Sequence, residues 1–503
     1  MNKKIIAFKD LSKIKSKFKN KKIVHCHGVF DLFHNGHLKY LNSAKKYGDI
    51  LVVSVTSDKF VNKGPGRPRF NENDRALMLS SLLIVDFVVI NNEPLAVNVI
   101  SKLKPDFYVK GKDYTNKKKD LTKGIFKEER ELKKINGKLV FTNDELNSST
   151  VLINEHFSQL DQDQKKAIQK IKKKFSINKI INYINRVQNE DVFILGEPII
   201  DQYIFCRPMN LSSKSPSIST NYLYKEDYAG GVLAIARQAA ALGCNVKCSF
   251  IANSEKTTQK IFKDIKKDKM IKLDYIQNSK IPTPIKTRFI EPKSKQRMFE
   301  IVNIKSNYNE NVMEKNLLKK IKLNFKKNSL NIVADFGHGL INNQIIDYLN
   351  KFKNFLSINV QTNSENYGFN LFTKYKNYQY LSIDERECRL GLHERYADIF
   401  KLGKSIHYKT KSNLAITLEK KGSVFFSNNK SYFCPAFYSN PIDTTGAGDA
   451  FFLITSLLVK SKCEPELIPF VGNMYAGLAT KIIGNSEPVK KIDLIRSINS
   501  ILS

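Results

Sequence analysis

A glycine-containing turn near the N-terminus carries two histidines three residues apart, in the segment Gly28-Val-Phe-Asp-Leu-Phe-His-Asn-Gly-His37. A short strand-like run precedes this segment and apolar residues at helical spacing follow it, so it is predicted to join a strand to a helix. A helix start presents free N–H groups and the positive end of the helix dipole, which both favour a phosphate. We therefore predict that His34 and His37 approach the oxygens of one phosphate. The alternative is a plain turn with two solvated histidines.

A second glycine-rich turn, Asp443-Thr-Thr-Gly-Ala-Gly-Asp449, precedes an apolar run that reads as a helix. Glycines free the backbone to surround a phosphate, and the helix start again offers N–H groups and a dipole. Asp449 would then lie at a phosphoryl group that is being transferred. The sequence thus predicts two phosphate sites that are far apart in the chain.

The elements that position these turns must form more than one domain, because 503 residues exceed one ordinary hydrophobic core. Apolar residues make up 42% of the chain, yet no apolar run approaches the roughly 20 residues that span a bilayer. The N-terminal residues lack the apolar stretch of a signal peptide, so we expect a cytoplasmic protein without a membrane span. The seven scattered cysteines contain no C-x-x-C pair, which predicts neither a disulfide framework nor a structural zinc site.

The formal net charge of +35 could indicate a nucleic-acid-binding protein. The basic residues are dispersed, however, and neither an aromatic–basic RNA signature nor a helix-turn-helix pattern accompanies them. A lysine-rich composition spread over solvated faces is the simpler explanation. We therefore expect no nucleic-acid partner, and a charge that favours anionic substrates such as nucleotides and sugar phosphates.

Strand-like and helical runs alternate through residues 1–157, which predicts a first α/β domain with a parallel sheet covered by helices. The predicted strands are 22–27, 49–56, 86–90, 106–110 and 138–142, and the predicted helices are 36–47, 72–84, 94–103 and about 126–135. Ligands of such sheets bind beyond the carboxyl ends of the strands, where the histidine turn would lie. A basic helical connector (158–190) and a second α/β domain (191–503) are expected to follow.

The spacing G-x-F-D-x-x-H-x-G-H resembles the nucleotidyltransferase family that includes cytidylyltransferases and heptose-phosphate adenylyltransferases. The resemblance implies a Rossmann-like domain that binds a nucleoside triphosphate through Gly28, Phe30, Asp31 and Gly36, together with the two histidines. Three later segments resemble the same family. They would supply a phosphate-contacting lysine, a lysine in a V-K-G-x-D-Y-like segment and the hydroxyl groups of an S-S-T signature: Lys63, Lys110, and Ser148, Ser149 and Thr150.

The reaction that this resemblance implies is attack by a substrate phosphate on the α-phosphorus of a nucleoside triphosphate, with release of pyrophosphate. The protein must position two phosphates and stabilise the transition-state charge, with Mg²⁺ bridging the triphosphate. Without the resemblance, the Ser-Ser-Thr segment would be read as a helix cap. Arg75 lies at the start of the next predicted helix. It could have a functional role in this site or be a plain surface arginine.

The D-T-x-G-A-G-D turn resembles the second signature of the ribokinase (PfkB) family of carbohydrate kinases. The resemblance implies a ribokinase-like α/β sheet and makes Asp449 the general base that accepts the proton of a sugar hydroxyl. The amides of Gly446, Ala447 and Gly448 would form an anion hole for the γ-phosphate.

Further segments of the second domain resemble other parts of the same family. The implied sugar-binding residues are Asp201, Gly230, Gly231, Lys286 and Arg288, where Lys286 and Arg288, with Arg297, could hold a second phosphate on the sugar. Asp384 and Glu387 would organise Mg²⁺, and Thr417 and Gly422 would lie on the nucleotide side. Three positions depart from the family pattern, since Glu197, Ala234 and His338 stand where aspartate, asparagine and lysine are usual.

Together the two resemblances match the bifunctional heptose-phosphate kinase/adenylyltransferases, with the order of the domains reversed. The implied protein is a bifunctional enzyme that phosphorylates a sugar or sugar phosphate with ATP and transfers a nucleotidyl group to a sugar 1-phosphate. ATP is favoured over CTP as the nucleotidyl donor, and a homodimer is expected. The alternatives are a cytidylyltransferase for a polyol or glycerol phosphate with an inactive kinase domain, and a sugar-phosphate-binding regulatory protein.

Overall fold

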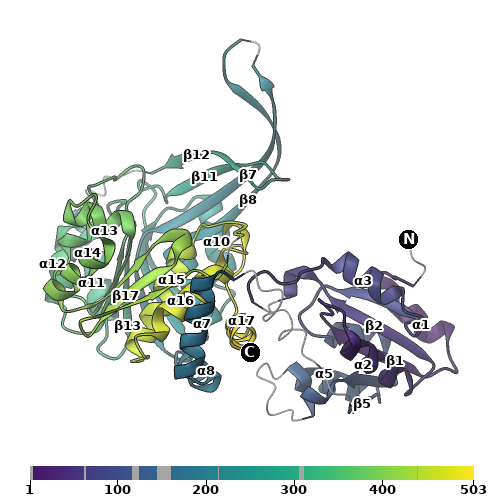
Figure 1. Cartoon of the computed structure of the whole chain (residues 1–503). Coiled ribbons are helices and arrows are strands. Elements are labelled where there is room, and N and C mark those ends of the chain that lie inside the picture. The colour runs from purple at the N-terminus through teal and green to yellow at the C-terminus, as the bar shows by residue number, and fades with distance from the viewer. Residues whose placement is uncertain are drawn as a thin grey trace. The chain divides into compact units, whose positions relative to one another are not determined.

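The computed structural model describes residues 4–61, 64–115, 124–143, 160–212, 214–304, 311–438 and 440–503. The chain forms two compact units (Figure 1). The N-terminal unit contains Met1–Leu160 and Ile495–Ser503, and the C-terminal unit contains Asp161–Leu494. Both are α/β, which confirms the predicted fold class. No helix in the described ranges combines the length and apolar character needed to cross a membrane, and all seven cysteines are buried and free.

The N-terminal unit is built on a five-stranded parallel sheet in the order β3-β2-β1-β4-β5. Each strand lies within one residue of its predicted bounds: β1 (Ile23–Gly28), β2 (Ile50–Thr56), β3 (Phe87–Asn91), β4 (Phe107–Lys110) and β5 (Lys138–Phe141). The helices are α1 (Leu11–Lys17), α2 (Asn35–Lys45), α3 (Glu72–Ser80), α4 (Val97–Leu103) and α5 (Gly124–Lys134). The predicted helix 72–84 ends early, because Leu82 and Ile84 pack on the core from turns rather than from a helix.

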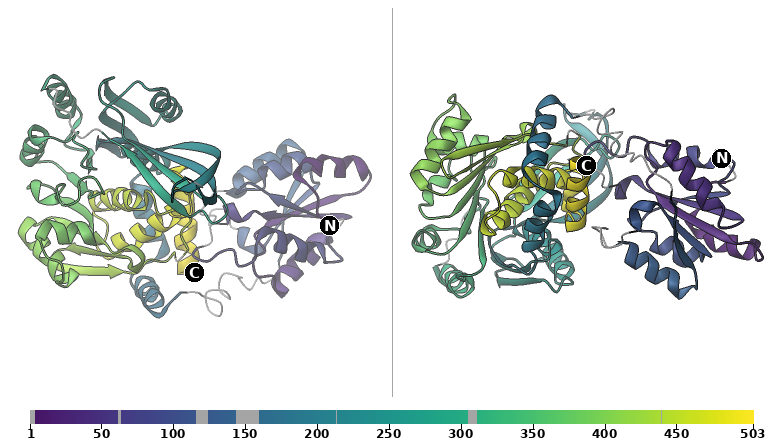
Figure 2. Two further views of the ribbon diagram at one scale, coloured as in Figure 1. Left: turned by 90° about the horizontal axis from the view of Figure 1, so that it is seen from above. Right: turned by 60° about the horizontal axis from the view of Figure 1, so that its bottom comes forward.

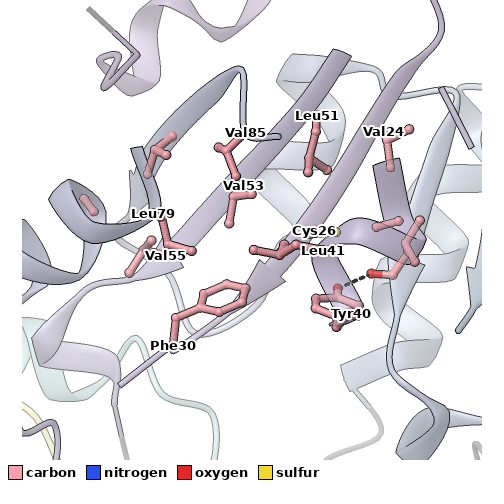
Figure 3. Packing of buried hydrophobic residues seen from close by; sticks show 14 residues of the cluster. Val24, Cys26, Phe30, Tyr40, Leu41, Leu51, Val53, Val55, Leu79 and Val85 are labelled. Atoms are coloured by element: carbon pink, nitrogen blue, oxygen red, sulfur yellow. Dashed lines mark hydrogen bonds between the residues drawn. The ribbon is translucent and has the colours of Figure 1, made fainter. Parts of the chain in front are cut away.

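Alternate residues of the central strands face opposite sides of this sheet. On one side the strands pack against α2 and α3 in the cluster shown in Figure 3, where the Tyr40 hydroxyl donates to the Val109 carbonyl at 2.7 Å. On the other side they pack against α1 and α4. The central strands are therefore rigidly held, which fixes the turn that follows β1.

Arg75 of α3 is fully buried, so the expectation that it could be a plain surface arginine is wrong. Its guanidinium donates to the carbonyls of Phe70, Val29 and Thr56 and pairs with Asp58 at 2.6 Å. These contacts hold together the segments that follow β1 and β2. The arginine is therefore a structural element of the loops around the histidine turn.

Replacing Arg75 with methionine is expected to destabilise the N-terminal unit by about 3–5 kcal/mol, because it leaves three carbonyls without their donor. Calorimetry of the full chain should show the thermal transition of that unit moving down while that of the C-terminal unit stays in place. Arg130→Met, at an exposed arginine of α5, is the matched control and should change little. Equal transitions for the two variants would contradict this role for Arg75.

The C-terminal unit contains a nine-stranded sheet in the order β10-β9-β6-β13-β14-β15-β16-β17-β18, with helices on both faces (Figures 1 and 2). Its strands are β6 (Asp191–Gly196), β9 (Asn245–Ala252), β10 (Ile271–Gln277), β13 (Leu330–Asp335), β14 (Leu356–Val360), β15 (Tyr380–Asp384), β16 (Asn413–Thr417), β17 (Ser423–Ser427) and β18 (Lys430–Cys434). The strands are parallel from β10 to β16, and β17 and β18 are antiparallel.

A separate four-stranded sheet, in the order β12-β11-β7-β8, belongs to the same unit. It consists of β7 (Pro198–Leu211), β8 (Ile218–Gly231), β11 (Ile285–Ile290) and β12 (Arg297–Asn303). Figure 1 shows the β7–β8 hairpin projecting beyond the rest of the unit. The helices are α7 (Gln162–Lys174), α8 (Ile177–Arg186), α9 (Val232–Ala241), α10 (Lys256–Ile265), α11 (Asn311–Asn324), α12 (Asn343–Lys351), α13 (Glu385–Leu392), α14 (Ile399–Thr410), α15 (Ala447–Lys460) and α16 (Leu467–Ala479). The last helix, α17 (Lys491–Leu502), begins in the C-terminal unit, and its residues from Ile495 on belong to the N-terminal unit.

Candidate functional site

The histidine turn lies at the point where the strand order of the N-terminal sheet reverses. The chain runs outward from β1 to β2 and β3, and then crosses to β4 and β5 on the other side of β1. In open parallel sheets a ligand crevice forms at such a switch point, beyond the carboxyl ends of the strands. The segment after Gly28 therefore begins where a nucleotide is expected to bind.

His34 and His37 are brought together at the start of α2, with ring centroids 4.1 Å apart. His34 is the N-cap of the helix, and its Nδ1 accepts a hydrogen bond from the Gly36 N–H at 3.0 Å. Burial lowers the pKa of His34, which favours the neutral ring. Because Nδ1 accepts the Gly36 hydrogen bond, the proton of the neutral ring lies on Nε2. That N–H can donate to a phosphate oxygen. The Phe30 and Phe33 rings, with centroids 5.3 and 5.5 Å from that of His37, hold the second imidazole.

The backbone after β1 turns sharply at Phe30, which adopts a left-handed conformation with φ of 52°. The Arg75 guanidinium holds the Val29 carbonyl. Within the described residues, the N–H groups of Val29 and Phe30 donate to no protein acceptor. Neighbouring N–H groups in such a turn form an anion-binding concavity. The loop can thus offer backbone donors beside the two histidines.

Asp31 and Lys110, both predicted nucleotide-binding residues, have partners inside the protein. The buried Asp31 carboxylate lies 2.8 Å from Arg67 Nε and accepts from the Arg69 N–H at 2.6 Å, which ties down the loop before α3. Lys110 Nζ lies 3.4 Å from the buried carboxylate of Glu128. Their burial and pairing indicate that both residues shape the site. Lys63, Ser148, Ser149 and Thr150, also predicted from the sequence, lie outside the described residues.

In the C-terminal unit, Asp449 lies in the first turn of α15, where its carboxylate accepts a hydrogen bond from Gln361 Nε2 at 2.7 Å. Burial raises the pKa of Asp449 to about 6, as does the negative charge of Asp201, against the effects of Gln361 and Lys286. A carboxylate with such a pKa can exist in both protonation states near neutral pH. This is the property that a general base requires.

The turn before Asp449 offers backbone donors at the helix start. Gly446, with φ of 78°, is the N-cap residue of α15, and a Cβ there would come within 2.3 Å of Asn485. The Ala447 N–H donates to the Thr444 carbonyl at 3.2 Å, so this amide, expected in the anion hole, is engaged in the turn. The N–H groups of Gly446 and Gly448 have no acceptor within the described part of the chain. Gly448 borders open space, since a Cβ added there would meet no atom within 4 Å.

Strands β7 and β11 bring the predicted sugar-binding residues into register, because Asp201 pairs with Lys286 across the parallel ladder. A Cβ at Gly230 would come within 2.2 Å of the Asp201 carboxylate, so only glycine lets β8 approach it. Gly231, with φ of 54°, then serves as the N-cap residue of α9. Arg288 is buried and paired with Asp201 and with Glu300, so its charge is already balanced.

Lys286 is therefore the cation that remains available on this face of β11. Its positive charge lowers the pKa of both Asp449 and His338, which indicates that it lies near both. It has no ion pair within the described residues. Lys286 can thus contact an anionic or hydroxyl-bearing ligand between Asp201 and Asp449.

The three departures from the family pattern, Glu197, His338 and Ala234, are all buried. The buried Glu197 accepts hydrogen bonds from the N–H groups of Phe336, His338 and Leu340 at 3.1–3.4 Å, a reach that the longer glutamate side chain provides. Burial, and then the charge of Lys286, lower the pKa of His338 to about 4. The His338 ring is consequently neutral at physiological pH, where a lysine would carry a charge. Ala234 packs in the buried face of α9.

Asp384 and Glu387, predicted to organise Mg²⁺, form a capping box at the start of α13. Glu387 accepts from the Thr362 and Asp384 N–H groups at 2.9 and 2.8 Å, so both of its oxygens are occupied. Glu387 therefore helps to fix the start of α13 and the backbone at Thr362. The described residues contain no cluster of three or more potential metal-ligating side chains. Asp384 pairs in register with Thr417 at the ends of β15 and β16, and Gly422, with φ of 111°, turns the chain into β17.

A cluster that the sequence did not predict holds the first aspartate of the glycine-rich turn. Asp443 accepts hydrogen bonds from the Tyr203 hydroxyl at 2.5 Å and from the Gly484 N–H at 2.8 Å, and Arg297 of β12 pairs with it at 2.7 Å. A pocket of about 230 Å³ adjoins this cluster. Arg297 thus connects the four-stranded sheet to the phosphate turn. Arg297 was predicted to help hold a sugar phosphate, but its pairing with Asp443 could not have been read from the sequence, because the two residues are 146 positions apart.

Comparison with known proteins identifies two regions of the chain. Residues 25–156 match the cytidylyltransferase-like family model, and residues 189–453 match the model of the pfkB family of carbohydrate kinases. This confirms the predicted order, with the cytidylyltransferase-like region first.

Curated relatives match over the N-terminal region only. The chain is 49% identical over 117 residues to the bifunctional protein HldE of Campylobacter fetus, a match that covers 23% of this chain and 25% of the relative. It is 51% identical over 100 residues to the HldE protein of Campylobacter jejuni, covering 20% of this chain and 22% of the relative. The chain thus spans about a quarter of the length of these relatives.

Among solved structures, phosphofructokinase-2 from Escherichia coli resembles the C-terminal unit in fold. The TM-score is 0.53 at 13% sequence identity, and the match covers 62% of this chain and 98% of that one. Since the pfkB model matches residues 189–453, more than half of the 503 residues, the chain belongs to the pfkB family of carbohydrate kinases.

Proposed function

We propose that the chain is a bifunctional enzyme that makes a nucleotide-activated, heptose-like sugar. The C-terminal unit phosphorylates a sugar or sugar phosphate with ATP. The N-terminal unit transfers a nucleotidyl group, with AMP favoured, from a nucleoside triphosphate to a sugar 1-phosphate and releases pyrophosphate. The observation that carries the proposal is that one chain combines a paired-histidine helix start with a glycine-rich helix start that ends in Asp449. Its N-terminal region also resembles proteins named as bifunctional.

In nucleotidyl transfer the protein has two phosphates to align. His34 Nε2–H and His37 would donate to oxygens of the α-phosphate, together with the Val29 and Phe30 N–H groups. Donors that are fixed in place before the reaction stabilise developing charge without having to reorganise. The sugar phosphate would then attack the α-phosphorus in line, and the pyrophosphate would leave.

In the kinase reaction the Asp449 carboxylate would accept the proton of the sugar hydroxyl as its oxygen attacks the γ-phosphorus. Lys286 would contact the substrate beside Asp201, and the Gly446 and Gly448 amides would receive the phosphoryl oxygens. Families of both kinds use nucleoside triphosphates with Mg²⁺, so we propose Mg²⁺ as the cofactor. The ion would be held by the phosphates of the nucleotide, with Asp384 and Glu387 as the predicted residues that organise it.

The experiment that tests the proposal follows ADP and pyrophosphate separately. The full chain is incubated with Mg²⁺, with ATP or CTP, and with a panel of sugars, sugar phosphates and polyol phosphates. We expect ADP from ATP with a heptose-like substrate, and pyrophosphate from ATP with a sugar 1-phosphate. Absence of pyrophosphate with every pair overturns the transferase assignment. Pyrophosphate from CTP and a polyol phosphate, without ADP, identifies the cytidylyltransferase alternative instead.

The rate of ADP formation should depend on pH through Asp449. Only the carboxylate can accept the hydroxyl proton, and its pKa is about 6. The value of kcat/KM should therefore be level above that pH and fall tenfold for each unit below it. Gln361→Met removes the donor that favours the carboxylate form, so it should move the inflection to higher pH. An inflection near pH 4 in the wild type would contradict this assignment.

We further propose that the chain forms a homodimer through the β7–β8 hairpin. Met209, Leu211 and Ile218 near its end are 56%, 65% and 69% exposed, and Leu211 and Ile218 face each other across the ribbon. An isolated two-stranded ribbon is marginally stable, and a second copy would cover these side chains. Sedimentation should show a dimer that Leu211→Asp with Ile218→Asp converts to a monomer. A wild-type monomer would contradict the proposal.

A further inference from the structure

A line of polar side chains crosses the centre of the N-terminal sheet, from β1 to β2 and back. His25 Nε2 lies 2.8 Å from Ser54 Oγ, and the same hydroxyl lies 2.8 Å from His27 Nδ1. Thr56 Oγ1 then lies 3.4 Å from His27 Nε2 and 3.4 Å from the Gly28 carbonyl. Gly28 is the first residue of the histidine turn. The line therefore ends at the start of the proposed nucleotidyl-transfer site.

Both imidazoles in this line are neutral at physiological pH. Burial, and then the positive charge of Lys110, lower the pKa of His27 to about 3. Burial also lowers the pKa of His25 well below its usual value. A neutral imidazole carries one N–H, so one ring nitrogen donates and the other accepts. These two histidines thus differ from a charged pair that would simply attract phosphate.

Among the four side chains and the Gly28 carbonyl of this line, the hydrogen bonds can all form together in only one direction. The Gly28 carbonyl can only accept, so the Thr56 hydroxyl donates its hydrogen bond to that carbonyl. The Thr56 oxygen therefore accepts from the His27 Nε2–H. With its proton on Nε2, His27 accepts at Nδ1 from the Ser54 hydroxyl. Ser54 in turn accepts from the His25 Nε2–H, and the buried His25 Nδ1 is left as an acceptor without a hydrogen-bond partner in the described chain. An orphaned acceptor is tolerated better than an orphaned N–H.

This direction places the His27 proton on Nε2, where its one protein acceptor in the line is the Thr56 hydroxyl. The distance from His27 Nε2 to Thr56 Oγ1 is 3.4 Å, and a hydrogen bond becomes weaker as the distance between donor and acceptor increases. His27 is half-buried rather than fully enclosed. It lies directly before Gly28, at the carboxyl end of β1, within the electrostatic reach of Lys110 at the end of β4. The position is the switch point of the sheet, where a ligand is expected.

We propose that His27 is a third histidine of the nucleotidyl-transfer site, whose Nε2–H donates to a phosphate oxygen and is aimed by Ser54 and His25. The inference rests on the proposed nucleotidyl transfer. His27 acts as a hydrogen-bond donor with a fixed direction, whereas Ser54 and His25 are positioning residues because they act through it. The oxygen belongs to the nucleoside triphosphate or to the sugar phosphate, and the KM of each substrate distinguishes the two sources.

Two replacements of His27 distinguish the loss of its Nε2–H donor from a general loss of packing around the side chain. The amide nitrogen of glutamine can occupy the Nε2 position, whereas asparagine reaches only the Nδ1 position. We expect His27→Gln to keep kcat for pyrophosphate release within about fivefold of the wild type, and His27→Asn to lower it by about 10²-fold, the loss typical of removing one preorganised donor. A KM increase confined to the triphosphate or to the sugar phosphate identifies which of them is bound. Equal losses in the two variants overturn the proposal.

Ser54→Ala provides the second test, and if His27→Asn does not fold, an unchanged kcat in Ser54→Ala alone overturns the positioning role. It removes the hydroxyl that aims His27, so kcat should fall by about tenfold with the thermal transition of the unit retained. Because Ser54 acts through His27, its effect should largely disappear in the His27→Asn background. Additive losses overturn the positioning role. A wild-type chain that releases no pyrophosphate overturns the proposed function together with this inference, whereas an active chain with indifferent variants overturns the inference alone.

Discussion

Replacing Asp449 with asparagine is expected to lower the rate of ADP formation by about 10²–10⁴-fold, the usual contribution of a general base. The asparagine amide is nearly isosteric with the carboxylate, and its oxygen can still accept the hydrogen bond from Gln361. It cannot accept a proton from a sugar hydroxyl. The loss should therefore appear in kcat, with the KM for ATP and for the sugar close to that of the wild type.

The control for this variant is Asp347→Asn, which makes the same chemical change at an exposed position on α12 of the same unit. It should leave ADP formation unchanged. Pyrophosphate release from a supplied sugar 1-phosphate should be unaffected by either variant, because the N-terminal unit does not use Asp449. A folded Asp449→Asn protein that lost both activities would contradict the model of two separate sites.

Local periodicity predicted the elements of the N-terminal unit well, because each strand is a short apolar run bounded by turn residues. All five strands lie within one residue of their predicted bounds. The helix predicted over 72–84 was less accurate, since Leu82 and Ile84 continue the helical pattern although they contact the core from turns. Periodicity reports which residues are buried, and a tight turn can bury residues as a helix does.

The candidate site was predictable where its residues follow one another in the chain. His34, Gly36 and His37 share one helix start, and Gly446 to Asp449 share another. The partners that modify these groups come from distant segments. Gln361, which contacts Asp449, is 88 residues away in the sequence, and no local pattern could have paired them.

Side chains to which the motif resemblance gave a binding role also make contacts inside the protein. The Asp384–Glu387 pair has the spacing of a capping box, a local signal that could have been read from the sequence. Asp31 and Arg75 are both buried, and both bond to the backbone at Phe70, before α3. A residue type shows what a side chain can contact, but only the long-range packing decides whether it contacts the protein or a ligand.

Replacing His37 with alanine is expected to have the opposite effect to the Asp449 variant. Pyrophosphate release should fall by about 10²–10³-fold, the range found when one preorganised donor to a developing charge is lost. The imidazole stacks on His34 and contacts the rings of Phe30 and Phe33, so alanine would also remove these ring contacts. ADP formation in the C-terminal unit should remain at the wild-type rate.

Asn42→Ala, at an exposed position two residues beyond Tyr40 on the same helix, is the control for a general effect on α2. Its rate of pyrophosphate release should match that of the wild type. If Asn42→Ala and His37→Ala lost activity equally, the loss would reflect the helix rather than the histidine. If His37→Ala retained full activity, the α-phosphate would have to bind elsewhere, and the phosphate-binding role of the paired histidines would be wrong. Loss of pyrophosphate release in His37→Ala alone, with ADP formation intact, would assign nucleotidyl transfer to the N-terminal unit.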